Sequence, residues 1–286
     1  MRSTSNPVFR NLPAQQGGGS AGYANFGSAA AGAGQFTQQY GQQQQYGQPD
    51  PWARPATTRP MTIDDVVTKT GITLGVLSVT AIVAYVLAQA NPGLAPLFVI
   101  GGGIVGLVLV LVATFGRKSD SPALVLAYAV AEGLFLGALS LMFTDVSFGG
   151  AGGAALIGQA VLGTFGVFFG MLIVYRTGAV RVTPRFTRFM LGALIGVVVL
   201  MLGNMIGAMF FDFNPLRDGG PLAIVFSLVC IGLAAFSFLL DFDAADQLIR
   251  AQAPEKAAWS VAFGLTVTLV WLYVEILRLL SYFQND

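Results

Sequence analysis

Glu132 has the clearest potential for chemistry, because it stands near the middle of an apolar stretch, AYAVAEGLFLGAL. A central charge in a membrane helix costs roughly 2.5 to 3.5 kcal/mol for Asp, Lys or Arg on insertion scales, so an acid there by default indicates function. Two interpretations fit. Glu132 is an ion ligand, gate or proton-titrating group inside a helix bundle, or it is a protonated acid hydrogen-bonded to a neighbouring helix.

A second group of acids stands at the end of another apolar stretch, FSFLLDFDAADQLIR. Asp246 and Arg250 are four residues apart in the favourable order, so we expect an ion pair at a solvated helix end. At about 100° per residue, Asp241 and Asp243 point to nearly opposite sides of a helix, so at most one faces the bundle interior. These carboxylates would attract cations to one mouth of a bundle. They fit an ordinary helix end equally well.

Glu275 and Arg278 are three residues apart in WLYVEILRLLSYF, close enough to neutralise each other inside a membrane. A structural ion pair and a gating pair both fit this spacing. Neutral polar residues within other apolar stretches are more typical of helix–helix hydrogen bonds than of ion ligands; they are Thr164, Thr266, Thr268 and Asn204.

The composition excludes most catalytic chemistry. The chain has no histidine, so it lacks the usual general base, the commonest metal ligand and the usual switch between about pH 5 and 8. The single Cys230 cannot form an intrachain disulfide. We therefore expect no enzyme and no cofactor beyond transient Ca²⁺, and any response to pH must come from carboxylates.

The elements that must position these residues are transmembrane helices. The 286 residues are 55% hydrophobic and only 10% charged, whereas about 25% of a soluble domain is charged. The 15 basic and 14 acidic residues nearly balance, so nucleic acid is not expected as a partner. Long continuous apolar runs exclude a barrel of alternating strands and predict helices that cross the bilayer. The predicted spans are 71–90, 94–116, 121–143, 154–175, 189–211, 221–242 and 257–282, with 241–256 connecting the last two.

Residues 1–60 differ from the rest, because they are rich in Gly and Gln and lack an apolar run after Met1. Such a segment predicts a disordered tail rather than a cleavable signal. We therefore expect two parts, the tail at 1–60 and an all-α bundle of seven transmembrane helices at 61–286.

The basic residues predict the orientation, because they concentrate on the cytoplasmic side of membranes. Arg217 stands alone on one side and Arg278 lies within the last span, whereas thirteen basic residues fall on the other side. These are Arg2, Arg10, Arg54, Arg59, Lys69, Arg117, Lys118, Arg176, Arg181, Arg185, Arg188, Arg250 and Lys256. The N-terminus is thus expected in the cytoplasm and Asp286 outside.

Six pairs of glycines four residues apart favour close helix contacts and a tightly packed, monomeric bundle. They are Gly71/Gly75, Gly102/Gly106, Gly133/Gly137, Gly166/Gly170, Gly192/Gly196 and Gly203/Gly207.

The order of these motifs resembles the Bax inhibitor family of seven-helix membrane proteins, in the branch with the bacterial YccA-like proteins. The similar stretches are EGLFLG (132–137), AVLGTFGVF (160–168), LLDFD (239–243) and AFGLTVTLVWLYVEILRLL (262–280), and the resemblance covers 61–286 without the tail. Ala138 stands where the family usually has Pro, and Phe165 stands where it has a small residue.

The resemblance implies a pH-sensitive calcium leak channel. In characterised relatives, an Asp on the sixth helix shares a proton with an Asp on the seventh, near an Arg at the end of the second. Arg117 matches the Arg, and Asp241 or Asp243 matches the sixth-helix Asp. The seventh-helix position falls on Glu275 by the local LY-x-acid pattern, or on Thr268 by an ungapped alignment.

Geometry favours Thr268. Asp241 lies about 13 residues before the turn near Pro254, Thr268 lies 14 after it and Glu275 lies 21 after it. At 1.5 Å per residue, Glu275 is roughly 12 Å further along the bundle than Asp241, so a direct contact between these two acids is not expected. Glu132 would then be the candidate to replace the missing acid.

These observations lead to two hypotheses. The first is a pH-modulated leak of cations, above all Ca²⁺, since hard cations prefer oxygen ligands. In this hypothesis, protonation of the buried acids removes the charge that holds Arg117 across the pore mouth. The alternative, implied by the YccA-like branch, is a regulator in the bacterial plasma membrane that binds a membrane protease or another membrane protein.

Overall fold

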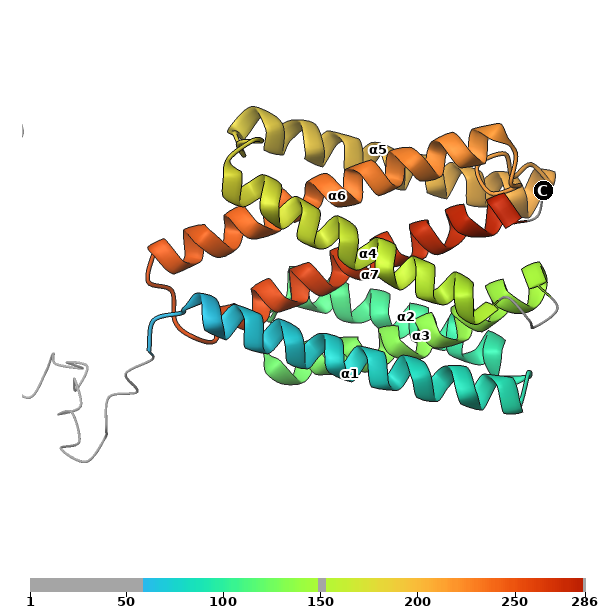
Figure 1. Ribbon diagram of the computed structural model, residues 1–286, viewed down its shortest axis with the longest axis horizontal. Helices are drawn as coiled ribbons and strands as arrows, with labels where there is room; N and C mark the ends of the chain where they lie inside the picture. The colour runs from blue at the N-terminus through green and yellow to red at the C-terminus, as the bar shows by residue number, and fades with distance from the viewer. Residues whose placement is uncertain (1–58, 149–152, 285–286) are drawn as a thin grey trace, which may run out of the picture. The chain divides into compact units, whose positions relative to one another are not determined.

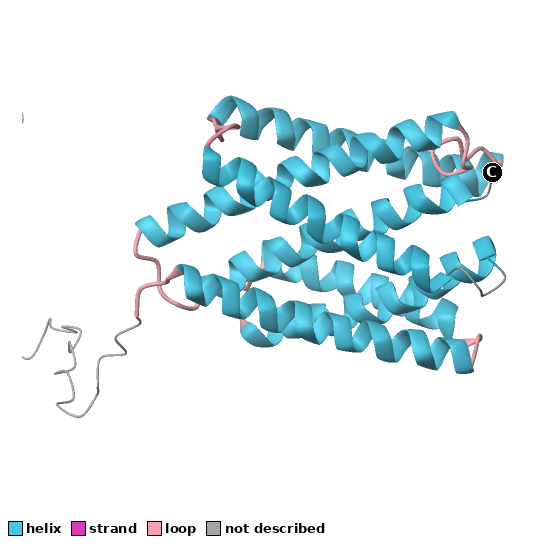
Figure 2. Cartoon of the chain, viewed as in Figure 1, coloured by secondary structure: helices cyan, strands magenta, loops and turns pink. Residues whose placement is uncertain are grey.

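The computed structural model of the chain describes residues 59–148 and 153–284, and it consists of seven α-helices with short connections (Figures 1 and 2). All seven are long and apolar enough to cross a membrane, so the predicted multi-pass bundle is confirmed. Nearly all of the predicted tail lies outside the described residues. The helices are α1 (Ile63–Ala90), α2 (Leu94–Phe115), α3 (Pro122–Phe148), α4 (Gly153–Thr177), α5 (Pro184–Phe211), α6 (Pro221–Arg250) and α7 (Ala257–Gln284).

Helix α1 begins eight residues before the predicted start at Gly71, because a polar cap precedes the apolar run. The Thr62 hydroxyl accepts a hydrogen bond from the backbone N–H of Asp65, and the Asp65 carboxylate accepts one from the backbone N–H of Thr62. This capping box satisfies two backbone donors at the helix start. The helix therefore begins in a polar turn that the apolar run did not indicate.

Helix α6 continues to Arg250, so the prediction that 241–256 connects two spans is wrong for its first ten residues. The apolar run ends near Phe242, but no helix-breaking residue follows. Pairs four residues apart support the extra turns: Gln247 donates to Asp243 at 2.6 Å, and Arg250 lies 2.8 Å from Asp246. The expected ion pair at the helix end is thus confirmed.

Helix α7 is the centre of the bundle and packs against α1, α3, α4 and α6. In Figure 1 it runs between α6 on one side and α1, α2 and α3 on the other. Helix α2 packs mainly on α3, and α5 packs on α6 at the edge. Side chains placed on α7 are consequently the most shielded from lipid, as are those of α3.

Only two of the six glycine pairs lie in close helix contacts. Gly102 and Gly106 of α2 face α3, and Gly133 and Gly137 of α3 face α1. The other four pairs do not bring helices together: all their members have open space around them except Gly207, which lies against the turn after its own helix. The expectation that all six mediate tight packing is wrong, since glycine spacing identifies a smooth face without identifying a partner.

Candidate functional site

A hydrogen bond between α6 and α7 forms the centre of the site. The hydroxyl of Thr268 lies 2.7 Å from an Asp241 carboxylate oxygen and donates to it, and Thr268 is buried. The other Asp241 oxygen faces Gly264, where an added Cβ would be 3.5 Å away. Among the described residues, no basic side chain pairs with Asp241. The site therefore holds a half-buried carboxylate that has no basic partner within ion-pair distance among the described residues.

Aromatic side chains of α4 and α6 pack together around the segment of α6 that carries Asp241. Phe238 and Phe242 flank Asp241 on α6 and are buried, and the Phe168 ring meets both edge-on at 5.3 and 5.6 Å between centroids. Such edge-to-face pairs add packing energy and fix the rings in place. The residues on both sides of Asp241 in α6 are therefore held in an apolar cluster.

The hydrogen bond between Thr268 and Asp241 confirms the geometric prediction that Asp241 faces Thr268 rather than Glu275. Asp243 points elsewhere, since it accepts a hydrogen bond from Gln247 of its own helix. Only one of the two aspartates thus faces α7, as their 200° separation on a helix requires at about 100° per residue.

Arg117 does not occupy the position that we expected. It follows the end of α2 with a positive φ of 50°, its side chain is exposed, and no ion pair joins it to Asp241 or Asp243 among the described residues. Asp241 bonds to Thr268 of α7 instead. The arginine gate across the mouth is therefore not formed.

Glu132 lies in a different interface, between α3 and α2. Its side chain is 8% exposed and accepts a hydrogen bond from the hydroxyl of Tyr128, one turn earlier. A Cβ at Gly106 would lie 2.5 Å from a Glu132 carboxylate oxygen, so a side chain there would require the Glu132 carboxylate to move. Tyr128 in turn packs edge-on against Phe263 of α7, with 5.0 Å between ring centroids. Glu132 and Asp241 thus do not form a carboxylate pair. Glu132 lies between α2 and α3, whereas Asp241 of α6 contacts α7.

Glu275 and Arg278 form the expected ion pair inside α7. One guanidinium nitrogen of Arg278 lies 3.0 Å from each Glu275 carboxylate oxygen, and the side chains are 9% and 1% exposed. Arg217 of the α5–α6 connection lies nearby, and desolvation followed by repulsion from Arg278 lowers its pKa. The pair neutralises both charges locally, so it does not depend on another helix.

The four neutral polar residues behave differently from one another. Thr164 and Thr266 donate to carbonyl oxygens of their own helices, and Asn204 bonds to residues of the α5–α6 connection. Among the four, Thr268 alone donates a hydrogen bond to another helix, to Asp241 of α6. The expectation of helix–helix hydrogen bonds is therefore right for Thr268 and wrong for the others.

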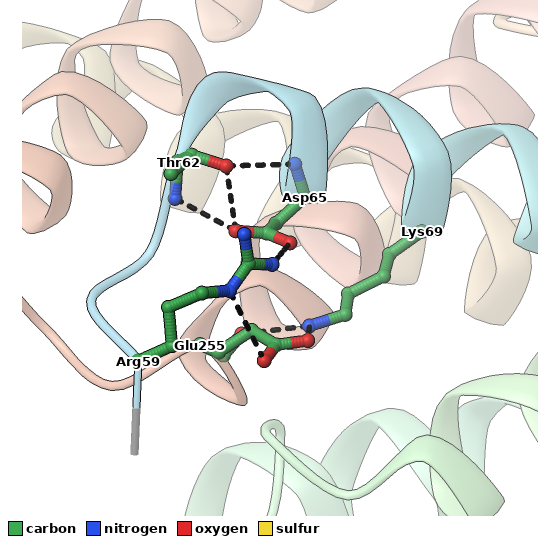
Figure 3. Close-up of polar contacts among 5 residues, drawn as sticks. All are labelled: Arg59, Thr62, Asp65, Lys69 and Glu255. Carbon is green, nitrogen blue, oxygen red and sulfur yellow. Dashed lines mark hydrogen bonds and ion pairs between the residues drawn. The ribbon is translucent and has the colours of Figure 1, made fainter. Parts of the chain in front are cut away.

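A polar cluster that the sequence did not predict ties the segment before α1 to the α6–α7 connection (Figure 3). We call it the clamp, and it consists of Arg59, Asp65, Lys69 and Glu255. Arg59 pairs with Asp65 and lies 3.7 Å from Glu255, and Lys69 lies 3.4 Å from the Glu255 carboxylate and donates to its backbone oxygen at 2.8 Å.

Backbone bonds reinforce the clamp. The N–H of Met61 donates to the carbonyl of Ala253 at 2.8 Å, and the N–H of Glu255 donates to that of Arg59 at 2.9 Å. A further ion pair, Lys256 to Asp120 at 2.9 Å, joins the same connection to the one between α2 and α3. The α6–α7 hairpin is therefore held at its turn by polar contacts to two other parts of the bundle.

Residues 6–285 match the family described as Bax inhibitor 1 like. The match begins far before residue 61, so the similarity to this family extends further toward the N-terminus than the motifs indicated. No curated protein matches the chain.

Proposed function

The chain belongs to the Bax inhibitor 1 like family of membrane proteins, and we propose that it is a pH-modulated leak pathway for cations, with Ca²⁺ as the ion. The observation that carries this proposal is the Asp241 carboxylate, which is held between α6 and α7 by Thr268 without a basic partner among the described residues. A purely structural carboxylate between two helices would be expected to have a counter-charge, as Glu275 has in Arg278.

The chemistry of the pair suits a hard cation. Ca²⁺ prefers carboxylate, carbonyl and hydroxyl oxygens, and Asp241, Thr268 and the Gly264 carbonyl supply one of each close together. No group of three or more acidic or cysteine side chains within 59–148 and 153–284 can hold a metal. The proposal is therefore a site of passage with transient binding, not a storage site.

Protonation gives the pathway its dependence on pH. Ionised Asp241 attracts a cation into the low-dielectric interior, whereas protonated Asp241 does not. Because the chain lacks histidine, carboxylates are the groups available for such a switch, with Glu132 as a second candidate beside α2. Acidification should therefore lower the flux.

The clamp sets the position of the hairpin that carries the site. Helix α6 ends and α7 begins at the connection that contains Glu255, and Glu255 pairs with Arg59 and Lys69. A movement of α6 relative to α7 that displaces this connection would strain the contacts of Glu255 with Arg59 and Lys69. We therefore assign the clamp a positioning role in which the segment before α1 acts on the α6–α7 contact.

The proposal includes a setting. We place the chain in the bacterial plasma membrane as a monomer and not an enzyme, with its N-terminus in the cytoplasm and Asp286 outside, which puts the clamp on the cytoplasmic side. The charge distribution and the seven spans support this orientation.

Calcium flux in liposomes tests the proposal. Purified full-length protein is reconstituted around a Ca²⁺-sensitive dye, and external Ca²⁺ is added at a series of pH values. We expect protein-dependent flux that falls with acid, against protein-free liposomes as control. Absence of flux at every pH would reject the leak and favour the alternative, a regulator of a membrane protease, which co-purification with membrane proteins would then examine.

A further inference from the structure

A cavity of about 430 Å³ lies between α1, α3, α4 and α7. Helices α1 and α4 each pack against α7, but they make no substantial contact with one another between their described residues. The cavity therefore has α7 and α3 behind it and α1 and α4 at its sides. Its volume is in the range of about 300 to 1,000 Å³ that small-molecule sites occupy.

The open side of the cavity faces the bilayer. Ile82 of α1 is 64% exposed, and Val161 and Phe165 of α4 are each 38% exposed, although all three line the cavity. Because α1 and α4 are membrane-spanning helices, their exposed apolar side chains face hydrocarbon. A molecule that enters here comes from the lipid phase rather than from water.

The lining is apolar and carries no charge. Its polar atoms are hydroxyls, and those deepest in the bundle are already bonded: Thr164 donates to the Ala160 carbonyl at 2.7 Å, and Ser140 lies 2.8 Å from the Tyr273 hydroxyl. Such a lining offers little to an ion, a sugar or a phosphate, because their polar groups would be left without partners. It offers dispersion contacts to a hydrocarbon chain.

An unfilled apolar cavity of this size is unfavourable in a bilayer. Its lining loses the van der Waals contacts that close packing would provide, and water is a poor occupant because it needs two to four polar partners. The molecule available at the opening is a membrane lipid, whose flexible acyl chain can fill an irregular space.

We propose that this cavity is a binding site for one acyl chain of a membrane phospholipid, which enters between α1 and α4 and ends against α7. The site is separate from the Asp241–Thr268 contact, since neither residue lines the cavity. It also does not depend on ion conduction. The lining residues of α1 and α3 lie mainly in the C-terminal halves of these helices, and those of α4 lie in its N-terminal half. The lipid therefore belongs to the leaflet at that side of the bundle.

Photocrosslinking tests the site. The full-length protein is placed in phosphatidylcholine nanodiscs that contain a trace of phosphatidylcholine with a diazirine on one acyl chain. Val270 and Tyr273 of the central helix are 9% and 8% exposed and line the cavity, so a chain in the cavity can label them. We expect label there as well as on the cavity face of α4.

Filling the cavity provides the contrast. Val161→Trp should lose most of the label on α7, and Val198→Trp on lipid-exposed α5 should keep it, because Val198 is 55% exposed and does not line the cavity. If Val161→Trp fails to fold by circular dichroism, Ser78→Phe fills the cavity from α1 and should have the same effect. The proposal would be overturned if α7 carries no label, or if the label on α7 persists in both Val161→Trp and Ser78→Phe. It would also be overturned if a free diazirine fatty acid labels α7 and the phospholipid does not.

Discussion

Replacing Gly137 by alanine should destabilise the bundle, because α1 and α3 approach each other at this residue. A Cβ at Gly137 would collide with the carbonyl oxygen of Ala81 and lie 2.9 Å from the Cβ of Ala84. The closest obstacle is backbone, which cannot rotate away as a side chain would. Relief requires α1 to move away from α3.

The magnitude follows from a matched comparison. Overpacking a tight contact costs about 1 to 3 kcal/mol, and the backbone obstacle at Gly137 favours the upper half of that range. Gly166→Ala on α4 is the control, because nothing lies within 4 Å of its Cβ position. Both substitutions gain the helix propensity of alanine, about 1 kcal/mol in soluble helices, so their difference isolates the packing cost.

The assay is reversible unfolding in mixed micelles of mild detergent and SDS, followed by circular dichroism. Gly137→Ala should have a free energy of unfolding about 2 to 3 kcal/mol below that of Gly166→Ala. Equal stability of the two variants would refute the close approach of α1 and α3, and with it the distinction between the packed and the open glycine pairs.

Three further predictions concern the ion pairs and the topology. Glu275→Gln leaves Arg278 buried without its partner and should lower the free energy of unfolding by about 3 to 5 kcal/mol, whereas removing both charges should cost much less, as a double-mutant cycle would measure. Glu255→Gln weakens the partly exposed clamp and should cost at most about 1 kcal/mol, yet it should speed hydrogen exchange at the start of α1; unchanged exchange would contradict the clamp's positioning role. A cysteine at Asp286 in a Cys230→Ser background should react with an impermeant maleimide on intact cells, and reaction only after lysis would mean that the orientation is wrong.

Much of the fold could be predicted because the bilayer imposes one strong rule on the sequence. A run of about 20 apolar residues must be helical to satisfy its backbone in lipid, and seven such runs gave the seven helices. Short-range pairs such as Glu275 with Arg278 follow from helical spacing alone. Counting residues on either side of the turn near Pro254 also placed Thr268 opposite Asp241.

Helix ends were harder, since hydropathy reports the hydrocarbon core and not the helix. The start of α1 depends on the cap at Thr62, and the end of α6 extends beyond Phe242 through polar turns that water tolerates. An apolar run therefore gives the minimum length of a membrane helix.

Contacts between distant segments could not be predicted from a single sequence. Lys69 and Glu255 are 186 residues apart, and neither shows in its local sequence that it has a partner. The same reason explains the glycine pairs and Arg117, because spacing and position along a helix do not specify which surface lies opposite.

The most direct test of the proposed leak compares Asp241→Asn with Asp243→Asn in the liposome assay across pH. The two substitutions are chemically identical and two residues apart on α6, but Asp241 contacts Thr268 of α7 whereas Asp243 bonds to Gln247 of its own helix. We predict that Asp241→Asn reduces Ca²⁺ flux at neutral pH toward the wild-type level in acid and flattens the pH profile, and that Asp243→Asn keeps the wild-type profile. A wild-type profile in Asp241→Asn, or the same flattening in both variants, would contradict the account.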